Sequence, residues 1–303
     1  MSSASVDAMP IRRDGLALEA ISDAVDTVNI LRRISAKDGE IKYDAESQFD
    51  AGKDKSIFRR YSEACERVKN FYAEQHAKQT LAHNLAARER FYSPSRKRPE
   101  MSVWEAIEML NALTDNSDPD TEMTQIQHAL QTAEAIRRDG KPRWMQLTGL
   151  IHDLGKLMLF LDDCSEGQWD VVGDTFPVGC RFDQRCIYPE LFEANPDSQH
   201  PVYSTKYGIY EPGCGLDKLI MSWGHDEYLY LVVKDQSTLP REALAMIRFH
   251  SFYPWHREGA YREFMAEGDE ELLRAVRAFN PYDLYSKTDD VKDVEELKVS
   301  WST

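Results

Sequence analysis

Residues 144–161 read WMQLTGLIHDLGKLMLFL, and this stretch decides the fold. Apolar residues fill nearly all of it, and their spacing is typical of a buried helix. His152, Asp153 and Lys156 lie in the middle of the segment. A carboxylate buried without a partner costs much free energy, so buried charges are paired or bind a metal ion. His152 and Asp153 offer a nitrogen and an oxygen ligand from one turn, which indicates a metal site.

The same stretch has a second, purely structural interpretation. Lys156 follows Asp153 by three residues, so the two side chains are spaced to form an ion pair on one helix face. His152 would then be a core histidine whose hydrogen bonds are satisfied locally. An HD dipeptide occurs by chance in many chains of this length, so a metal site requires further ligands elsewhere.

The charge balance limits the partners of the protein. The chain has 303 residues, with 37 Lys and Arg against 52 Asp and Glu, a net charge of −15. That field repels nucleic-acid phosphates and anionic lipid surfaces, so we expect no nucleic acid and no membrane as partner. A neutral polar small molecule or a cation fits better. No apolar run is long enough to span a bilayer, and the N-terminal residues lack the order of a signal peptide.

The cysteines indicate a reducing compartment. Their number is odd and their spacing follows no ligand pattern, so we expect free thiols in the cytoplasm. The cysteines are Cys65, Cys164, Cys180, Cys186 and Cys214. Nothing in the sequence requires more than a monomer.

The pattern along the chain predicts an all-α fold. Residues 1–54 are polar, and we interpret them as a mobile N-terminal arm, followed by a single helical domain over residues 55–303. Period-two strands are few or absent, and residues 173–215 are rich in Gly and Pro, which predicts a long irregular loop. The expected helices before the central one are a long helix from Ser56 to about His76, one after the capping box of Ser102 and Glu105, and one capped by Thr124. The central helix covers residues 144–161. After it we expect a helix over residues 216–233, one from Pro240, and a short one over residues 270–279.

Four histidines and two aspartates in the helical segments have apolar or aromatic surroundings. They are His128, His152, Asp153, His225, His250 and Asp283. The set is larger than one metal ion needs, but it suits two ions if one carboxylate bridges them. Without cysteine ligands, structural zinc and iron–sulfur clusters are disfavoured, whereas imidazole with carboxylate suits iron, zinc or manganese.

Each of these candidates also has a structural alternative. His225 could only cap or hydrogen-bond within its helix, and His250 could pack under Trp255. Asp283 could pair with Lys287, four residues further on. Their joint occurrence in the most apolar helices favours the metal site.

Longer motifs carry a resemblance to a known family. They are DNSDPD (115–120), QHALQTAE (127–134), GLIHDLGK (149–156), VVGDTFPVGC (171–180), MSWGHDEYLY (221–230), MIRFHSFYPWH (246–256) and FNPYDLYSK (279–287). Together they resemble the myo-inositol oxygenase family of the HD-domain superfamily. The likeness runs from about Lys55 to Val294, and the tail after Leu297 is shorter than is usual in that family.

This resemblance implies an HD-domain-like helical core and an oxygenase that cleaves the C1–C6 bond of myo-inositol with dioxygen, giving D-glucuronate. It implies two iron ions, Fe(II) and Fe(III), with dioxygen as co-substrate. By the family pattern, His128, His152 and Asp283 would hold one iron, His225 and His250 the other, and Asp153 would bridge them. The substrate contacts that the motifs imply are Arg59, Asp115, Ser117, Lys156, Gly173, Asp174 and Ser251.

Lys156 has a catalytic role in this interpretation. It lies one turn from His152 and Asp153, so its ammonium would reach the same cavity, hydrogen-bond a substrate hydroxyl and help to remove its proton. Asp115, Ser117 and Asp174 are suitable partners for the other hydroxyls of a polyol, because each buried hydroxyl left unpaired costs affinity. The alternative for Asp115 and Ser117 is turn chemistry alone.

Two other functions compete with the oxygenase. An HD-type phosphohydrolase would use two metal ions to activate water at a phosphate ester. The acidic chain and its carboxylate-rich loops argue against that substrate. A non-catalytic helical module would use the histidines only for structure.

Overall fold

The computed structural model describes residues 42–95, 99–119, 124–161, 163–288 and 294–301. Within these residues the chain is helical, and its β pairing is limited to one isolated bridge between Pro177 and Met221. The prediction of an all-α, HD-domain-like fold with long irregular loops is therefore confirmed. The α-helices are α2 (Glu66–Lys78), α3 (Leu81–Tyr92), α4 (Val103–Leu110), α5 (Gln125–Arg138), α6 (Arg143–Ile151), α7 (His225–Gln236), α8 (Arg241–Phe249), α9 (Tyr253–His256), α10 (Asp269–Tyr285) and α11 (Val294–Trp301).

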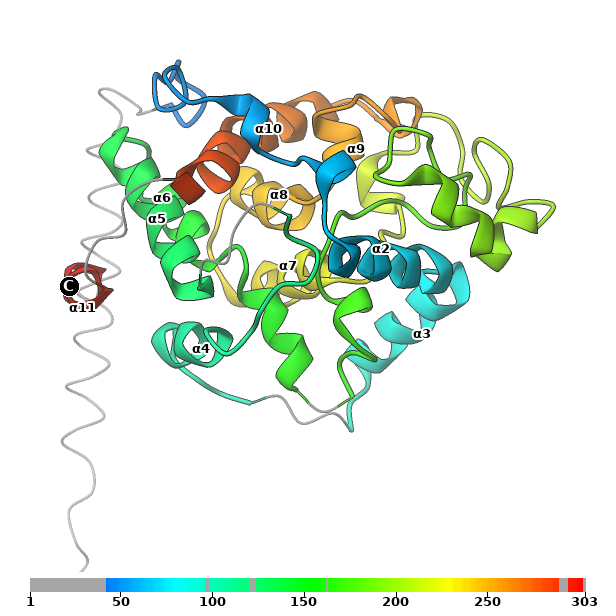
Figure 1. The fold of residues 1–303 in the computed structure, drawn as a ribbon, viewed down its shortest axis with the longest axis horizontal. Coiled ribbons are helices and arrows are strands. Elements are labelled where there is room, and N and C mark those ends of the chain that lie inside the picture. The colour runs from blue at the N-terminus through cyan, green and yellow to red at the C-terminus, as the bar shows by residue number, and fades with distance from the viewer. Residues whose placement is uncertain (1–41, 96–98, 120–123, 162, 289–293, 302–303) are drawn as a thin grey trace, which may run out of the picture. The chain divides into compact units, whose positions relative to one another are not determined.

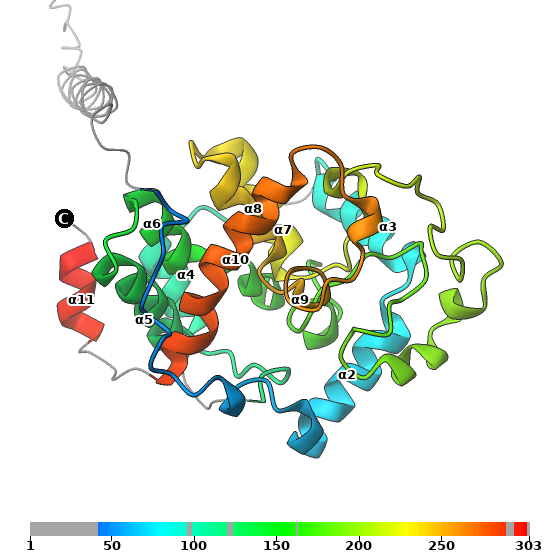
Figure 2. The same cartoon turned by 90° about the horizontal axis from the view of Figure 1, so that it is seen from above.

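The core is a set of helices that pack on one another in pairs. Helix α5 contacts α6 and α10, and α8 contacts α6, α7 and α10 (Figures 1 and 2). Gly149 allows the close approach of α5 and α6, because a β-carbon there would stand 2.7 Å from the side chain of Ile136. Buried residues such as Leu130, Met145 and Ile247 fill the space between these helices.

The central segment is a helix with a break rather than one continuous helix. Helix α6 ends at Ile151, and a tighter 3-10 helix, η3 (Leu154–Phe160), follows. The break lets α7 approach, because Gly155 packs against the backbone of His225 with no room for a side chain. Lys156 still lies beside Asp153 across this break, with its Nζ 3.0 Å from Asp153 Oδ2. The segment is not buried all round, since Leu147 and Phe160 are exposed.

Local signals placed the starts of two helices correctly, those that begin with a capping box. Ser102 with Glu105 and Thr124 with Gln127 both form complete capping boxes. The expected long helix from Ser56 is wrong. Two 3-10 turns, one of them η2 (Tyr61–Glu63), precede α2, and Arg59 between them has a positive φ of 57° that no helix accommodates.

Three further predictions about helices differ from the structure. Contacts between distant segments explain the differences at α7 and α10. Helix α3 was missed, although Thr80 caps it by accepting a hydrogen bond from the His83 amide. Helix α7 begins at His225 rather than near residue 216, because the preceding residues are extended and pair with the loop at Pro177. Helix α10 runs through Pro281 to Tyr285, well past residue 279, because buried aromatic side chains on both sides of the proline fix it to the core.

The described end of the expected arm lies on this core. The ring of Tyr43 packs on Trp144, and that of Phe49 packs on Tyr282. The rest of the arm, residues 1–41, lies outside the described residues. All five cysteines are free. Among the described residues, no helix has the length and apolar character needed to cross a bilayer.

Candidate metal centre

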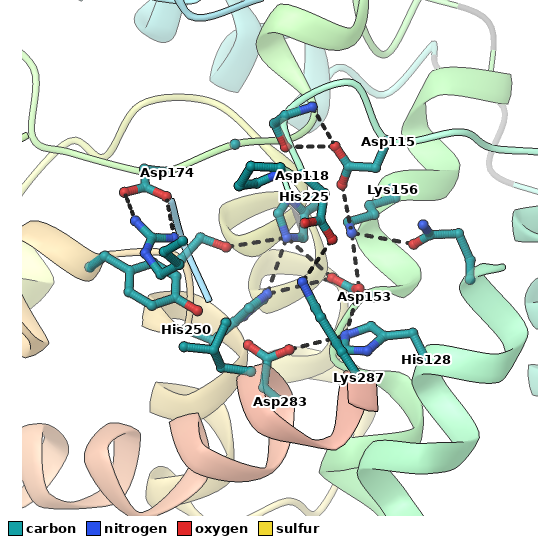
Figure 3. A pocket seen from close by; sticks show the side chains of 18 of the residues that line it. Asp115, Asp118, His128, Asp153, Lys156, Asp174, His225, His250, Asp283 and Lys287 are labelled. Atoms are coloured by element: carbon teal, nitrogen blue, oxygen red, sulfur yellow. Dashed lines mark hydrogen bonds and ion pairs between the residues drawn. The ribbon is translucent and has the colours of Figure 1, made fainter. Parts of the chain in front are cut away.

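A pocket lies between α5, α7, α8 and α10 and the loops at residues 115–119 and 173–174 (Figure 3). Its lining includes Arg59, Asp115, Ser117, His128, Asp153, Lys156, Gly173, Asp174, His225, His250, Ser251 and Asp283. His152 is the one expected site residue outside this lining, and it lies fully buried behind Asp283. Segments that are distant in the sequence therefore bring every residue of the expected site together.

The first group of ligand atoms comes from α5, the break after α6, and α10. His128 Nε2 lies 3.0 Å from Asp283 Oδ1, and His152 Nε2 lies 3.4 Å from the same oxygen. Both nitrogens also lie 3.6 Å from Asp153 Oδ2. Two imidazole nitrogens thus face one oxygen of Asp153, and both also lie beside Asp283 Oδ1.

The second group comes from the first residue of α7 and the residue after α8. His225 Nε2 and His250 Nε2 lie 3.1 Å apart, at 3.4 and 3.6 Å from Asp153 Oδ1. Each carboxylate oxygen of Asp153 therefore faces a different group. This is the arrangement that a carboxylate bridging two metal ions requires.

Helix ends fix the direction of two imidazoles. His152 follows the last residue of α6, and its Nδ1 donates to the carbonyl oxygen of Gly149 at 2.8 Å. His250 has the same position after α8 and donates to Ile247 at 2.9 Å. The last carbonyl groups of a helix lack partners within it, so each histidine satisfies one of them. With the proton on Nδ1, the electron pair of Nε2 points into the pocket.

His225 is held in the same way by a loop. Its Nδ1 donates to the carbonyl oxygen of Val171 at 2.7 Å, and Gly224 before it is extended, which lets the chain turn into α7. Burial outweighs the neighbouring carboxylates and lowers the pKa of His128, which favours the neutral form of that imidazole. Neutral imidazoles with Nδ1–H bonded outward are the form that binds metal ions.

A metal ion fits the convergent atoms of both groups. His152 Nε2 is completely buried and has no hydrogen-bond partner, and in the neutral form of both rings, with the proton on Nδ1, the facing nitrogens of His225 and His250 offer each other only electron pairs. Buried acceptors without donors are costly, and a cation between them removes the cost. Imidazole and carboxylate are suitable ligands for a first-row transition metal.

The pKa values of the carboxylates and imidazoles in the pocket depend strongly on one another's charge. Burial alone would raise the pKa of Asp153, but Lys156 and the surrounding imidazoles hold that pKa well below its usual range. Burial lowers the pKa of His225, but the carboxylates of Asp226 and Asp153 outweigh it and raise the pKa to about 10. The pocket thus concentrates negative charge around His225, which favours a cation there.

Lys156 lies at the border between the metal groups and the rest of the pocket. Its Nζ is 3.0 Å from Asp153 Oδ2, 3.0 Å from Asp115 Oδ2 and 3.3 Å from Gln125 Oε1. Burial lowers the pKa of Lys156, but the two carboxylates outweigh it and raise the pKa above the ordinary value. A protonated amine donates hydrogen bonds and has no free electron pair. In this form Lys156 can donate a hydrogen bond to a substrate hydroxyl, and its part in removing the proton of that hydroxyl stays a prediction.

Arg59 closes another side of the pocket. Its two terminal nitrogens donate to the two carboxylate oxygens of Asp174 at 3.1 and 2.7 Å, and its guanidinium stacks 3.4 Å from the ring centre of Tyr253. The left-handed backbone at Arg59 directs the side chain inward. A two-point pair of this kind fixes the orientation of both side chains.

The contacts of Asp115 and Ser117 agree with both interpretations of these loop residues, turn chemistry and a place beside the substrate. Ser117 donates to Asp115 Oδ1 from its amide at 2.9 Å and from its hydroxyl at 2.6 Å, which is turn chemistry. The other oxygen of Asp115 accepts from Lys156 and faces the pocket. Gly173 has a φ of 91°, and a β-carbon there would strike Phe71, so a close turn puts this backbone into the lining. Asp120, at the end of the same acidic cluster as Asp115, lies outside the described residues.

The structural alternatives for His250 and Asp283 find no support in these contacts. His250 packs against the rings of His152 and His225, rather than under Trp255. Lys287 pairs with Asp118 at 2.7 Å, and the ion pairs of Asp283 are with His128 and His152.

Sequence reasoning missed several residues that line the pocket. They are Tyr61, Tyr72, Gln125, Tyr253 and Lys287. Gln125 lies one turn before His128 on α5, a spacing that could have identified it. Tyr61, Tyr72 and Lys287 come from segments whose approach to the pocket depends on the whole fold, and no local pattern indicates them. Asp226, beside His225, was also passed over.

Comparisons with known proteins show which family the sequence resembles. A family model described as myo-inositol oxygenase matches residues 65–303. The chain is 50% identical over 248 residues to a probable inositol oxygenase of Oryza sativa subsp. japonica, with 80% of each chain covered. It is 46% identical over 272 residues to an inositol oxygenase of Dictyostelium discoideum, with 88% of this chain and 93% of the other covered. An inositol oxygenase of Sus scrofa is 46% identical over 254 residues, covering 82% and 88%.

Proposed function

The chain belongs to the myo-inositol oxygenase family, and from that membership we propose that it oxidises myo-inositol to D-glucuronate with dioxygen. The protein is an oxygenase that acts on a small polyol. In the reaction one molecule of dioxygen accepts four electrons from the C1–C6 bond and the C1–H and O–H bonds of the substrate. The products are D-glucuronate, water and a proton, so atoms and electrons balance.

One observation carries the proposal beyond family membership. Two groups of buried ligand atoms share the carboxylate of Asp153, one oxygen to each group. The chain therefore has binding positions for metal, and the family supports that conclusion. We propose that the metal is two iron ions, one Fe(II) and one Fe(III). In this proposal His128, His152 and Asp283 hold one iron, His225 and His250 hold the other, and Asp153 bridges them.

When bound, the irons would supply activation of dioxygen and would lower the pKa of a coordinated substrate hydroxyl. The residues around them would bind and orient the polyol. We propose that Lys156 donates to a substrate oxygen, and that Asp115 and Ser117 accept or donate to neighbouring hydroxyls. Arg59, Gly173, Asp174 and Ser251 would contact the remaining side of the ring.

The charges of the pocket argue against the alternative HD-type phosphohydrolase. Each basic side chain in the described lining is paired with a carboxylate: Arg59 with Asp174, Lys156 with Asp115 and Asp153, and Lys287 with Asp118. A phosphate ester would have to compete with these carboxylates for every cation. A neutral polyol instead finds both donors and acceptors, because it can exchange hydrogen bonds with each pair.

The test is oxygen uptake by the full chain, loaded anaerobically with Fe(II) and then partly oxidised. We expect uptake that depends on myo-inositol, with one D-glucuronate formed for each dioxygen consumed. Loading with Zn(II) is the matched control and should give no uptake. Absence of uptake by an iron-loaded sample, together with release of phosphate from a phosphomonoester, would favour the phosphohydrolase.

We further propose a cytoplasmic monomer whose catalytic domain spans residues 55–303. The five free cysteines support a reducing compartment. The described residues of the site come from one chain, so its chemistry needs no second copy.

A further inference from the structure

One buried carboxylate of the pocket region has no role in the proposed centre. Asp226 follows His225 in α7 and is 1% exposed. Its Oδ1 lies 2.8 Å from His225 Nε2 and 3.6 Å from His250 Nε2. It therefore borders the second group of ligand atoms, in the place that Asp283 takes in the first group (Figure 3 shows His225, His250 and Asp283).

The contacts of Asp226 place its Oδ1 beside two imidazole nitrogens. The Nδ1 atoms of His225 and His250 donate to backbone carbonyl groups, so in the neutral, metal-binding form of these rings their Nε2 atoms carry electron pairs. Three electron-rich atoms then face one another: these two nitrogens, 3.1 Å apart, and the carboxylate oxygen. Only a positive charge among them makes that arrangement favourable.

The spacing is that of neighbouring ligands on one metal ion. Two ligand atoms at right angles, each bonded at about 2.1 Å, stand about 3 Å apart. The separations of 2.8 Å from Asp226 Oδ1 to His225 Nε2 and 3.1 Å between the imidazoles match that value closely. The third separation, 3.6 Å to His250, is wider and closes with a small movement of the carboxylate.

Ser251 holds the carboxylate of Asp226 through two hydrogen bonds. The amide of Ser251 donates to Asp226 Oδ2 at 3.1 Å, and its hydroxyl donates to Oδ1 at 3.0 Å. If Oδ1 leaves the metal position, these two hydrogen bonds from Ser251 still give the carboxylate of Asp226 its donors. Asp226 therefore has two sets of partners for the same oxygen, the metal position and the hydroxyl of Ser251.

We propose that Asp226 is a ligand of the second metal position in the substrate-free protein and that the substrate displaces it. This inference rests on the proposed function, because it needs the metal centre and a polyol that chelates through its hydroxyls. Binding of two substrate oxygens would move Asp226 Oδ1 fully onto Ser251. Asp226 then competes with the substrate for the metal. Removal of its charge should weaken the binding of the second metal ion and maintain or strengthen the binding of the substrate.

The experiment is an anaerobic titration of the metal-free protein with Fe(II), followed by myo-inositol, both monitored by calorimetry. Wild type should bind two equivalents of Fe(II). Asp226→Asn keeps an acceptor for Ser251 but loses the charge, so the second equivalent should bind at least about tenfold more weakly, with the first unchanged. At saturating Fe(II), this variant should bind myo-inositol as tightly as wild type or more tightly. Asp226→Glu should recover part of the metal affinity.

Ser251→Ala is the matched comparison, because it removes the hydroxyl partner and leaves the carboxylate. It should leave both Fe(II) affinities unchanged and weaken myo-inositol. If Asp226→Asn behaves like Ser251→Ala, with metal affinity intact and substrate affinity reduced, Asp226 only orients Ser251 and the inference is overturned. A wild type that binds fewer than two Fe(II) overturns the proposed centre and this inference together.

Discussion

Gly155 packs directly against the backbone of His225, so closely that a β-carbon at position 155 would overlap the His225 carbonyl oxygen. This contact joins the break in the central segment to the first residue of α7. It thereby fixes the distance between Asp153 and the imidazole of His225, which the second metal position depends on.

We expect Gly155→Ala to push α7 away from the central segment. The overlap involves backbone atoms, which move less easily than a side chain, so stability should fall by about 1–3 kcal/mol. Metal content of the second position should fall as well, as measured by titration with Fe(II). Gly52→Ala is the control, because no atom lies within 4 Å of its added carbon. Equal stability of the two variants would refute the close contact.

Asp153→Ala should lose both metal ions, because this carboxylate faces both groups of imidazoles. Metal content by elemental analysis should fall from two ions to almost none. Asp235→Ala, at an exposed position of α7, should keep both ions. Retention of one ion in Asp153→Ala would mean that the first group binds metal without the bridge.

Lys156→Ala should keep both metal ions and lose turnover. The ammonium is expected to act on the substrate, and loss of one such group typically lowers kcat by about 10²-fold or more. Elemental analysis and oxygen uptake, measured on the same sample, separate the two effects. A variant that remains active would show that the contacts of Lys156 with Asp115 and Asp153 serve only to neutralise buried charge.

Arg59→Met should destabilise the protein, because it leaves the buried carboxylate of Asp174 without its two-point partner. Breaking a buried pair in this way typically costs about 3–5 kcal/mol. The double variant Arg59→Met, Asp174→Asn should recover part of the loss, since no uncompensated charge remains. Urea unfolding of the two single variants, the double variant and wild type measures the coupling, and simple additivity would argue against a pair in solution.

His76 should make stability depend on pH. Burial lowers its pKa from 6.5 to about 4, with the ring stacked on Phe192. The unfolded chain therefore binds a proton at a higher pH than the folded protein does. The contribution is complete above pH 6.5 and is lost as pH falls towards 4, by about 3 kcal/mol.

His76→Phe keeps an aromatic ring at this position and removes the titration. Its urea midpoint should depend less steeply on pH between 6.5 and 4 than that of wild type. Comparison at each pH cancels the contribution of the other histidines. Parallel curves would mean that the pKa of His76 is ordinary in the folded protein.

The sequence was a good guide wherever a property is decided locally. The capping boxes at Ser102 and Thr124 depend on residues three positions apart, so their helices were predicted to begin where they do. The six expected metal ligands were proposed because polar groups in apolar helices require partners, and their role as ligands stays a prediction. Their convergence then followed from the fold.

What the sequence could not reveal depends on contacts between distant segments. The break at Asp153 exists because α7 approaches Gly155, about 70 residues further along the chain, and no local pattern encodes that approach. Helix α10 continues through Pro281, although a proline inside a helical pattern predicts that the helix ends there. Asp226 was passed over because its contacts with Ser251 and His250 are formed only in the folded protein.

Hydrogen bonds to main-chain carbonyl oxygens hold the rings of His152, His225 and His250, and these bonds affect which metal ions the protein acquires in the cell. Rings held in this way keep their direction before any ion arrives, so the empty protein is already a template. A rigid template of imidazole and carboxylate discriminates poorly among divalent ions, and the supply of each ion then decides which one enters. Protein made in medium with surplus zinc or manganese should therefore emerge loaded with the wrong ion, correctly folded and inactive.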